Sequence, residues 1–579
     1  MVDSFPSRAI PLYMTMQNLN ATGTMIHTPN YRVFLIEKYG APARRTITKR
    51  IQAQLISRVV EMLLFLTLVL LVFSNQPVQA GNPQILPYCQ PQSLSTSCLS
   101  IVCVCNATFC DELESPGVLG YDEVQLYTSS EDGDRVLRTT LSFDTAATSS
   151  NRIHIETEIR HQQIVGFGST FSDAAAITVS SLSSGAKKNA IDAYFSPKGA
   201  EYTLGRLPMG GTDFSLREYS YDDVAGDFGL EQFLLADEDI KYKIPLIKAA
   251  QAVSNIDINL FGSPWLTPSW MREIVNGEMM LKGAPNGQYY ETWAKYYTKF
   301  VEAYAARSVD IWGLSVQNEP NAGFGRLANL PNLTMAYTPK LQRDFIKLNL
   351  GPVLKSTNAT KDIKLIVMDD QRDAASVWAD TIFGDTEASR YSDGIGVQWY
   401  SDSAFSTATL GTIHKNYPKK FILGTEAGFS FDKDNIGCWD RAEQYAFDII
   451  NDMNKFITGW VDLNLFVDNV GGPNRVGLTS DAAIIVDSSK DQIYKQPMFY
   501  IMAHFSKFIR PGAHRVQMQM PGGAYGTAFV NAWGQRALVV LNRAKSGVTS
   551  FSISDSSKPG KFLNVKMKPR SIFTAVWDK

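Results

Sequence analysis

The chain has 579 residues, 45% of them hydrophobic and 19% charged, and its formal net charge is −2. This length exceeds what one hydrophobic core supports, so we expect two or three folding units. The near-zero charge and the lack of a large basic cluster argue against a nucleic-acid partner and favour a neutral or weakly charged ligand.

The first 80 residues are predicted to form a leader that ends in a secretory signal peptide. Residues 62–73 are an apolar run with one Thr, preceded by basic residues and followed by Val78-Gln79-Ala80. A transmembrane helix needs roughly 20 apolar residues, whereas a short run before small residues is typical of a cleaved signal. We expect cleavage near Ala80 and a soluble mature protein; a short N-terminal anchor is the alternative.

Five of the six cysteines closely follow this leader, at Cys89, Cys98, Cys103, Cys105 and Cys110. In an oxidising compartment we expect such a cluster to form disulfides in a small N-terminal unit. A zinc site would need paired Cys-x2-Cys units, which this spacing does not supply. The remote Cys438 is expected to be free. Sequons at Asn106, Asn332 and Asn358 are typical of glycosylation in a secreted or lysosomal protein.

Residues 81–162 are predicted to form a disulfide-stapled β segment, because residues 152–159 alternate apolar and polar side chains. From 163 to 498, short apolar strands alternate with helical patterns at 244–253, 287–306, 339–354 and 440–453. The strands are expected at 163–168, 202–208, 258–263, 311–316, 363–368, 394–398, 421–424 and 460–466. Eight such alternations predict a (β/α)8 TIM barrel.

After about Met498 the helical pattern is predicted to end, and residues 499–579 are expected to form a C-terminal β-sandwich segment. Short strands at 536–541, 549–554 and 572–577 are separated by Gly, Pro and Ser turns. Since β segments flank the barrel on both sides, we expect them to pair with each other. The predicted fold class is α/β: a TIM barrel with an appended all-β domain built from the N- and C-terminal segments.

Polar and aromatic residues follow the predicted barrel strands, where TIM barrels carry their active sites. Aromatic rings stack on the C–H face of a sugar, while carboxylates, amides and Arg hold its hydroxyls. Only His414 lies in the central region, which argues against a Ser-His-Asp triad or a His-ligated metal. The strand-end residues include Arg206, Asp213, Phe214, Trp265, Asn318, Glu319, Asp369, Asp370, Gln371, Gln398, Tyr400, Glu426 and Asp462.

Glu319 and Glu426 are the sharpest candidate pair among these residues. Each follows an apolar strand, and the fourth and seventh strands lie on opposite sides of a barrel mouth, so the carboxylates can face across a sugar. A retaining glycosidase uses one such group as nucleophile and the other as acid and then base, about 5–5.5 Å apart. From the residues alone, a solvated cap at a strand end is the alternative for either Glu.

Ordered motifs from about Pro87 to the C-terminus resemble the lysosomal glucosylceramidases of glycoside hydrolase family 30. The motifs include Gly166-Phe-Gly168, Ser263-Pro-Trp265, Asn318-Glu-Pro320, Asp369-Asp-Gln-Arg372, Thr425-Glu-Ala427 and Gly471-Gly-Pro-Asn474. The resemblance implies a retaining β-glucosidase that hydrolyses glucosylceramide, with Glu426 as nucleophile and Glu319 as general acid/base. It implies no cofactor and no metal.

The same resemblance implies further residues and partners. A lysosomal enzyme, peripheral on the lumenal membrane face, would act on glucosylceramide with an anionic phospholipid surface and a saposin-type activator protein; secretion is the alternative location. Disulfides Cys89–Cys103 and Cys105–Cys110 are implied, leaving Cys98 unmatched. The implied sugar-binding residues are Arg206, Asp213, Phe214, Trp265, Asn318 and Tyr400.

Three positions depart from the family pattern. Leu463 stands where a Trp is expected, Gln398 where a His is expected, and Arg475 where an aromatic residue is expected. These differences leave the exact sugar and lipid open, so a family member that cuts another β-glycoside, such as a polysaccharide, is the alternative. A non-catalytic glycolipid-binding protein is less well supported, because both candidate carboxylates are present.

Overall fold

The computed structural model describes residues 88–95, 97–99, 101–324 and 333–579. The predicted leader and the sequon at Asn332 lie outside these ranges. In the part of the chain that is described, no helix is both long and apolar enough to cross a membrane.

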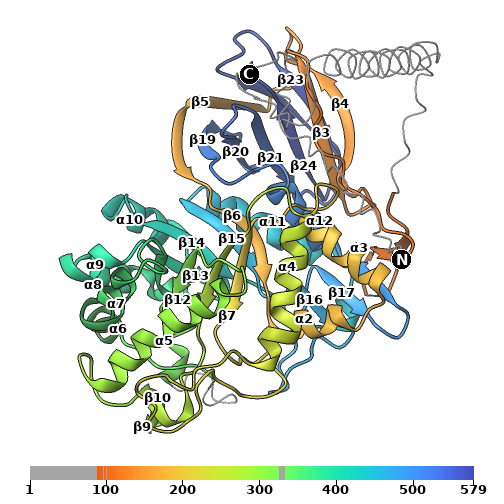
Figure 1. Cartoon of the computed structure of the whole chain (residues 1–579). Helices are drawn as coiled ribbons and strands as arrows, with labels where there is room; N and C mark the ends of the chain where they lie inside the picture. The colour runs from red at the N-terminus through yellow and green to blue at the C-terminus, as the bar shows by residue number, and fades with distance from the viewer. Residues whose placement is uncertain (1–87, 96, 100, 325–332) are drawn as a thin grey trace, which may run out of the picture. The chain divides into compact units, whose positions relative to one another are not determined.

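Eight parallel strands close into the predicted barrel (Figure 1). Each strand is buried along almost its whole length, as expected for parallel strands covered on both faces. The eighth strand lies at Ile457–Asp462, a few residues before its predicted place. The barrel strands are β6 (Gly166–Thr170), β7 (Leu204–Pro208), β8 (Asn259–Ser263), β11 (Gly313–Ser315), β12 (Lys364–Gln371), β13 (Gly394–Gln398), β14 (Phe421–Glu426) and β15 (Ile457–Asp462).

Helices connect the barrel strands. The aromatic side chains on the inner face of α5 are buried, as expected for a helix that packs one face on the barrel. The predicted helix 339–354 is interrupted between α6 and α7 by a π-helical turn at Ile346–Leu350, next to Pro352, which has no backbone N–H to donate. The helices are α2 (Asp173–Ser180), α3 (Ser184–Phe195), α4 (Ile244–Val253), α5 (Gln288–Ala305), α6 (Pro339–Phe345), α7 (Gly351–Ser356), α8 (Ala375–Phe383), α9 (Thr386–Tyr391), α10 (Ala408–Asn416) and α11 (Trp439–Met453).

The two ends of the chain share one nine-stranded sheet, as predicted. β24 pairs with β3, and β5 pairs with both β19 and β22. Its strands are β3 (Glu123–Ser130), β4 (Leu137–Ser142), β5 (Arg152–Gln163), β19 (His514–Gln519), β20 (Tyr525–Val530), β21 (Arg536–Asn542), β22 (Thr549–Asp555), β23 (Leu563–Met567) and β24 (Ser571–Trp577).

The N-terminal disulfide segment joins a second, five-stranded sheet. β1 (Pro91–Gln92) pairs with β2 (Val102–Cys105), and β2 pairs with β18 (Gln492–Lys495). On its other side β18 pairs with β17 (Ile484–Asp487), which pairs with β16 (Phe466–Asp468).

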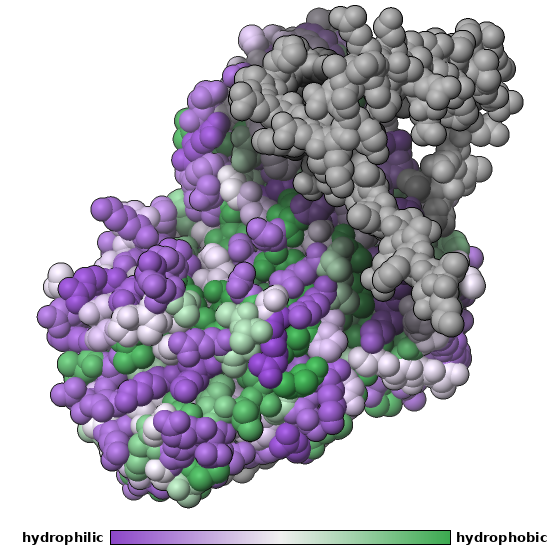
Figure 2. Space-filling model, in the orientation of Figure 1, coloured by the Kyte–Doolittle hydropathy of each residue, from purple (hydrophilic) through white to green (hydrophobic). Residues whose placement is uncertain are grey.

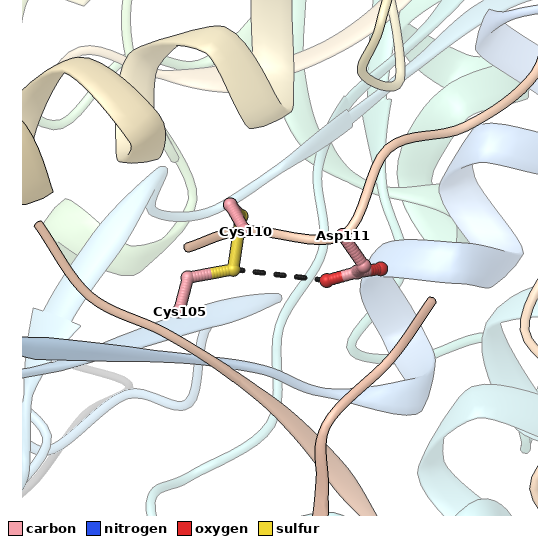
Figure 3. Close-up of side chains that lie close together, drawn as sticks. All are labelled: Cys105, Cys110 and Asp111. Carbon is pink, nitrogen blue, oxygen red and sulfur yellow. Dashed lines mark hydrogen bonds between the residues drawn. A yellow bond between two sulfur atoms is a disulfide. The ribbon is translucent and has the colours of Figure 1, made fainter. Parts of the chain in front are cut away.

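The two disulfides expected in this segment, Cys89–Cys103 and Cys105–Cys110, are present. Figure 3 shows Cys105–Cys110 beside Asp111, whose Oδ1 lies 3.7 Å from the Sγ of Cys105. The Asp111 carboxylate also pairs with Lys495 at 2.7 Å. These contacts tie the N-terminal segment to β18.

Cys98 and Cys438 form a third disulfide, so the prediction that Cys438 is free and Cys98 unmatched is wrong. The two residues are 340 positions apart in sequence, with a Cα–Cα distance of 5.8 Å. Cys438 caps the start of α11, and the nearby carbonyl of Asp434 accepts hydrogen bonds from two serine hydroxyls of the N-terminal segment. No local sequence pattern predicts a contact between residues so far apart in the chain.

One further helix, α12 (Pro497–Ser506), lies beyond Met498, so the prediction that helices end there is wrong. All ten of its residues are buried. A helix that is apolar on every side lacks the periodic polar face by which helices are found in a sequence. His504 on α12 exchanges hydrogen bonds with Thr574 at 2.8 Å and Ser129 at 2.9 Å, which connects the helix to the nine-stranded sheet.

Candidate active site

A cavity of about 500 Å³ opens where the barrel strands end. Both candidate carboxylates line it: Glu319, just after β11, and Glu426, the last residue of β14. Three of the expected sugar-binding residues line it too, and apolar side chains complete a wall suited to a small polar ligand. Its lining includes Asp213, Phe214, Asn321, Asp370, Gln371, Tyr400, Phe429, Leu463, Leu478 and Thr479.

Arg206 on β7 lies beneath this cavity and has no exposed surface. Its guanidinium pairs with Glu426, donates to Asn318 Oδ1 at 2.6 Å and contacts Asp369 Oδ2 at 2.9 Å. Burial lowers the pKa of Arg206, but the two carboxylates outweigh this effect and raise it. The ring of Trp265 lies 4.7 Å from the guanidinium. Arg206, Asn318 and Trp265 therefore support the cavity rather than line it.

Glu426 receives two strong donors. Arg206 contacts one carboxylate oxygen, and the hydroxyl of Tyr400 donates to the other at 2.9 Å. Burial raises the pKa of Glu426, while Arg206 and the Tyr400 hydroxyl oppose that rise. Of the two cavity glutamates, Glu426 is the one whose ionised form the site stabilises directly.

Glu319 lies in a different environment. Its backbone has a positive φ of 41°, an unusual conformation for a residue with a side chain, and its N–H donates to Asp369 O at 2.9 Å. Burial raises the pKa of its carboxyl well above the ordinary value, and the negative charge of Glu426 and then Asp370 raises it further. The pKa of both carboxyl groups is raised by burial, but that of Glu319 is raised well above its ordinary value, so the site favours a protonated Glu319 more strongly than a protonated Glu426.

Two amide side chains, Gln371 and Gln398, form a hydrogen-bonded chain that ends at Glu319. The Gln371 side-chain N–H₂ donates to Glu319 Oε1 at 3.2 Å and to Gln398 Oε1 at 3.1 Å. Gln398 in turn donates to Asn318 Oδ1 at 3.2 Å. Gln398 is thus a buried link between strand ends and lies outside the cavity lining. Sequence reasoning placed Gln371 and Asp369 at a strand end, but it did not single them out as partners of the site.

The other two departing positions lie at the cavity rim. Leu463 lines the cavity beside Phe429 and Leu478. Arg475 donates from Nε to Thr212 O at 3.1 Å and from its backbone N–H to Asp213 O at 3.2 Å. Arg475 therefore fixes the loop after β7 that carries Asp213 into the cavity.

Replacing Arg475 with Ala is expected to raise KM about three- to tenfold, because one side-chain hydrogen bond is worth about 0.5–1.5 kcal/mol. The change in kcat should be smaller, because the contacts of Arg206 beneath the cavity are untouched. Steady-state kinetics on an aryl glycoside test this. Arg390→Ala, at an exposed position on α9 that does not line the cavity, is the control. An unchanged KM in Arg475→Ala would contradict the role given to this residue.

Two family models match the chain: "Glycosyl hydrolase family 30 TIM-barrel domain" over residues 164–509 and "Glycosyl hydrolase family 30 beta sandwich domain" over residues 512–575. The chain belongs to glycoside hydrolase family 30. It is a glycoside hydrolase with the barrel and β domain of that family.

Relatives of this family-30 chain carry glucosylceramidase names. It is 39% identical to lysosomal acid glucosylceramidase of Mus musculus, over 85% of this chain and 96% of that protein. It is 42% identical to a Caenorhabditis elegans protein whose name, glucosylceramidase 3, is provisional, over 85% and 95%. Among solved structures, SrfJ from Salmonella typhimurium superposes with a TM-score of 0.72 at 25% identity, over 79% of this chain and 100% of SrfJ.

Two predicted glycosylation sites lie among the described residues of this hydrolase. Asn358 is exposed. Asn106 is half-buried, and its Oδ1 accepts hydrogen bonds from the backbone of Thr108 at 2.9 Å and Phe109 at 3.0 Å. Glycosylation at either Asn stays a prediction.

Proposed function

We propose that this hydrolase is a retaining β-glucosidase that converts glucosylceramide to glucose and ceramide. The observation that carries the proposal is the unequal environment of two carboxyl groups in one cavity. Glu426 is held by a guanidinium and a phenol, whereas Glu319 is buried beside negative charge. Environments that separate two carboxyl groups in this way assign one as nucleophile and the other as acid.

In the first step, a carboxylate oxygen of Glu426 attacks the anomeric carbon while Glu319 gives its proton to the departing ceramide oxygen. The product is a glycosyl ester, in which Glu426 no longer carries a negative charge. One cause of the raised pKa of Glu319 is thereby removed, so the ionised form of Glu319 becomes easier to hold than before the attack. It can then take a proton from the water that hydrolyses the ester.

The rest of the cavity suits a glucose unit. Burial and the charge of Glu426 raise the pKa of Asp213 to about 6, so in an acidic compartment its carboxyl can donate as well as accept hydrogen bonds to sugar hydroxyls. The rings of Phe214 and Phe429 line the same cavity. Both rings offer apolar surface to the C–H face of a sugar.

The ceramide tail implies action at a lipid surface. Large apolar side chains are exposed on the segments that follow barrel strands: Leu216, Val224 and Leu234 after β7, Ile274 on the hairpin strand β9 (Arg272–Val275) after β8, and Phe405 after β13. Figure 2 shows hydrophobic side chains in groups among hydrophilic ones on the face in view. With the mouse lysosomal relative, these residues support a lysosomal enzyme that acts with anionic phospholipid and a saposin-type activator.

A β-glucan is the second candidate substrate. The chain is 27% identical to an endo-1,6-β-D-glucanase of Neurospora crassa over 66% of its length. It also superposes on "the endo-beta1,6-glucanase BT3312" with a TM-score of 0.69 at 26% identity. Release of glucose from glucosylceramide in detergent, compared with hydrolysis of β-1,6-glucan and xylan, separates these substrates.

A 2-deoxy-2-fluoro-β-glucosyl fluoride is expected to inactivate the enzyme by esterifying Glu426 at one label per chain, because the fluorine slows hydrolysis of the glycosyl ester. Mass spectrometry of a peptic digest locates the label. An aryl glucoside in excess should protect the enzyme. A label on Glu319, or on any other residue, would overturn the nucleophile assignment.

A further inference from the structure

Arg372 lies among three buried carboxyl groups behind the active site. Its Nη2 is 2.7 Å from Asp452 and 3.9 Å from Asp448, and it also pairs with Asp402. These four side chains are only 3–7% exposed. One guanidinium cannot balance three ionised carboxylates away from water, so the cluster is stable only while it holds at least one proton.

The cluster adjoins the group that supports Glu319. Arg372 opens the short 3₁₀ helix Arg372–Ala374 and follows Gln371, the last residue of β12, directly. The Gln371 amide donates to Glu319 at 3.2 Å. A shift of Arg372 would therefore move the backbone that carries this donor.

The cluster also adjoins the group that supports Glu426. Asp402 lies two residues after Tyr400, whose hydroxyl donates to Glu426 at 2.9 Å. The N–H of Asp402 donates to Trp399 O at 2.9 Å, which closes a tight turn around Tyr400. The position of the phenol thus depends on where Asp402 is held.

We propose that Arg372 and Asp402 are positioning residues that hold Gln371 and Tyr400 against the two catalytic glutamates, and that their hold depends on a proton retained in the cluster. Asp448 and Asp452 supply the fixed side of the cluster, because both lie on α11. The inference rests on the proposed function, since Gln371 and Tyr400 matter through Glu319 and Glu426.

Asp402 shares the retained proton with its neighbours, since burial also raises the pKa of Asp452 well above its ordinary value and raises that of Asp448. Burial raises the pKa of Asp402, as do Asp452 and Asp448, and against the lowering effect of Arg372 the value reaches about 10. Among the described residues, the charged groups that shift the pKa of Asp402 most strongly are Arg372, after β12, and Asp448 and Asp452, both on α11. The protonated carboxyl hydrogen-bonds to Asp448, which in turn accepts from Trp460 Nε1 at 3.0 Å.

The sign of the pH effect follows from this raised pKa. In the unfolded chain the carboxyl has its ordinary value of 3.8, so from about pH 4 to about pH 10 the folded chain binds more protons than the unfolded one. The contribution of Asp402 to stability is therefore complete at low pH and is lost as the pH rises. In the folded chain the proton itself is retained through the acidic and neutral range and is lost only as the pH approaches 10.

The test is Asp402→Asn in the full chain, because Asn donates a hydrogen bond to Asp448 but has no proton to lose. For hydrolysis of an aryl β-glucoside, we expect kcat/KM within about twofold of wild type both near pH 5 and near pH 7.5, because wild-type Asp402, with a pKa of about 10, keeps its proton at both. Thermal unfolding should show a melting temperature that falls less with rising pH than in wild type.

Three further variants sharpen the comparison. Asp452→Asn removes one carboxyl group from the same cluster on the α11 side and is expected to reproduce the effect of Asp402→Asn on the melting temperature, so it carries this test if the first variant does not fold. Asp362→Asn removes one exposed carboxylate and is expected to follow wild type. Asp402→Ala, which removes the contact to Arg372, is expected to lower kcat/KM about tenfold near pH 5 and to lower it less in a Tyr400→Phe background, because the hydroxyl that the loop positions is gone there.

The outcomes separate the two claims. If wild type hydrolyses the aryl glucoside but Asp402→Ala folds with an unchanged kcat/KM, the positioning role is wrong; if both Asn variants share the melting temperatures of wild type at every pH, the retained proton is wrong. In both cases the proposed function stands. If Asp402→Asn folds but is inactive at every pH, its ionised form is needed and the proposal is overturned. If wild type has no β-glucosidase activity, the proposed function fails, while the melting temperatures still test the proton in the cluster.

Discussion

Replacing Glu319 with Ala is expected to lower hydrolysis of glucosylceramide by about 10²–10⁴-fold, the usual contribution of a positioned acid/base group. The loss should depend on the leaving group. A ceramide oxygen needs the proton of Glu319, whereas a dinitrophenolate leaves without it, so the first step with a dinitrophenyl glucoside should stay fast. Hydrolysis of the glycosyl ester then becomes slow, because no base activates water.

Azide separates this role from a structural one. A small anionic nucleophile needs no general base, so added azide should restore turnover of the dinitrophenyl glucoside by Glu319→Ala and yield a β-glucosyl azide, the product of two inversions. Glu302→Ala, at an exposed position on α5, is the control and should respond to azide as wild type does. An α-configured product, or no rescue at all, would count against Glu319 as acid/base.

The barrel could be predicted from the sequence because its strands are buried on both faces and form short apolar runs. The same physics hid α12, whose ten residues are all buried, so that no polar face marks the helix. The disulfide between Cys98 and Cys438 was hidden for another reason. It depends on how the N-terminal segment packs beside α11, and local patterns carry no information on that packing.

The sequence predicted which strand ends form the site, but it did not predict the hydrogen bonds and ion pairs that connect them. Glu319 and Glu426 follow apolar strands, which is a pattern that a sequence displays. The contact between Asp369 and Arg206 depends on an irregularity in β12, where the register shifts between Met368 and Asp370 and Asp369 has a positive φ of 69°. A bulge of this kind changes the direction of a side chain, and no sequence pattern in this stretch predicts a bulge.

Replacing Arg206 with Met is expected to affect both stability and activity. The change leaves Glu426 and Asp369 buried without their shared cation, and breaking a buried ion pair from one side destabilises a protein by about 3–5 kcal/mol. Near-neutral activity should fall by about 10²–10³-fold, the usual cost of removing one preorganised electrostatic donor, because Glu426 loses its strongest stabilising charge. Thermal unfolding and kcat/KM measure the two effects.

The pH profile of Arg206→Met decides whether the arginine acts on the chemistry or only on the fold. Without the guanidinium, the pKa of Glu426 rises, so the acid limb of kcat/KM should move to higher pH. Arg510→Met is the matched control, because Arg510 is also buried and pairs with Glu201 at 3.5 Å, away from the cavity. It should lose stability but keep the acid limb of wild type. An unmoved acid limb in folded Arg206→Met would show that Arg206 does not set the ionisation of Glu426.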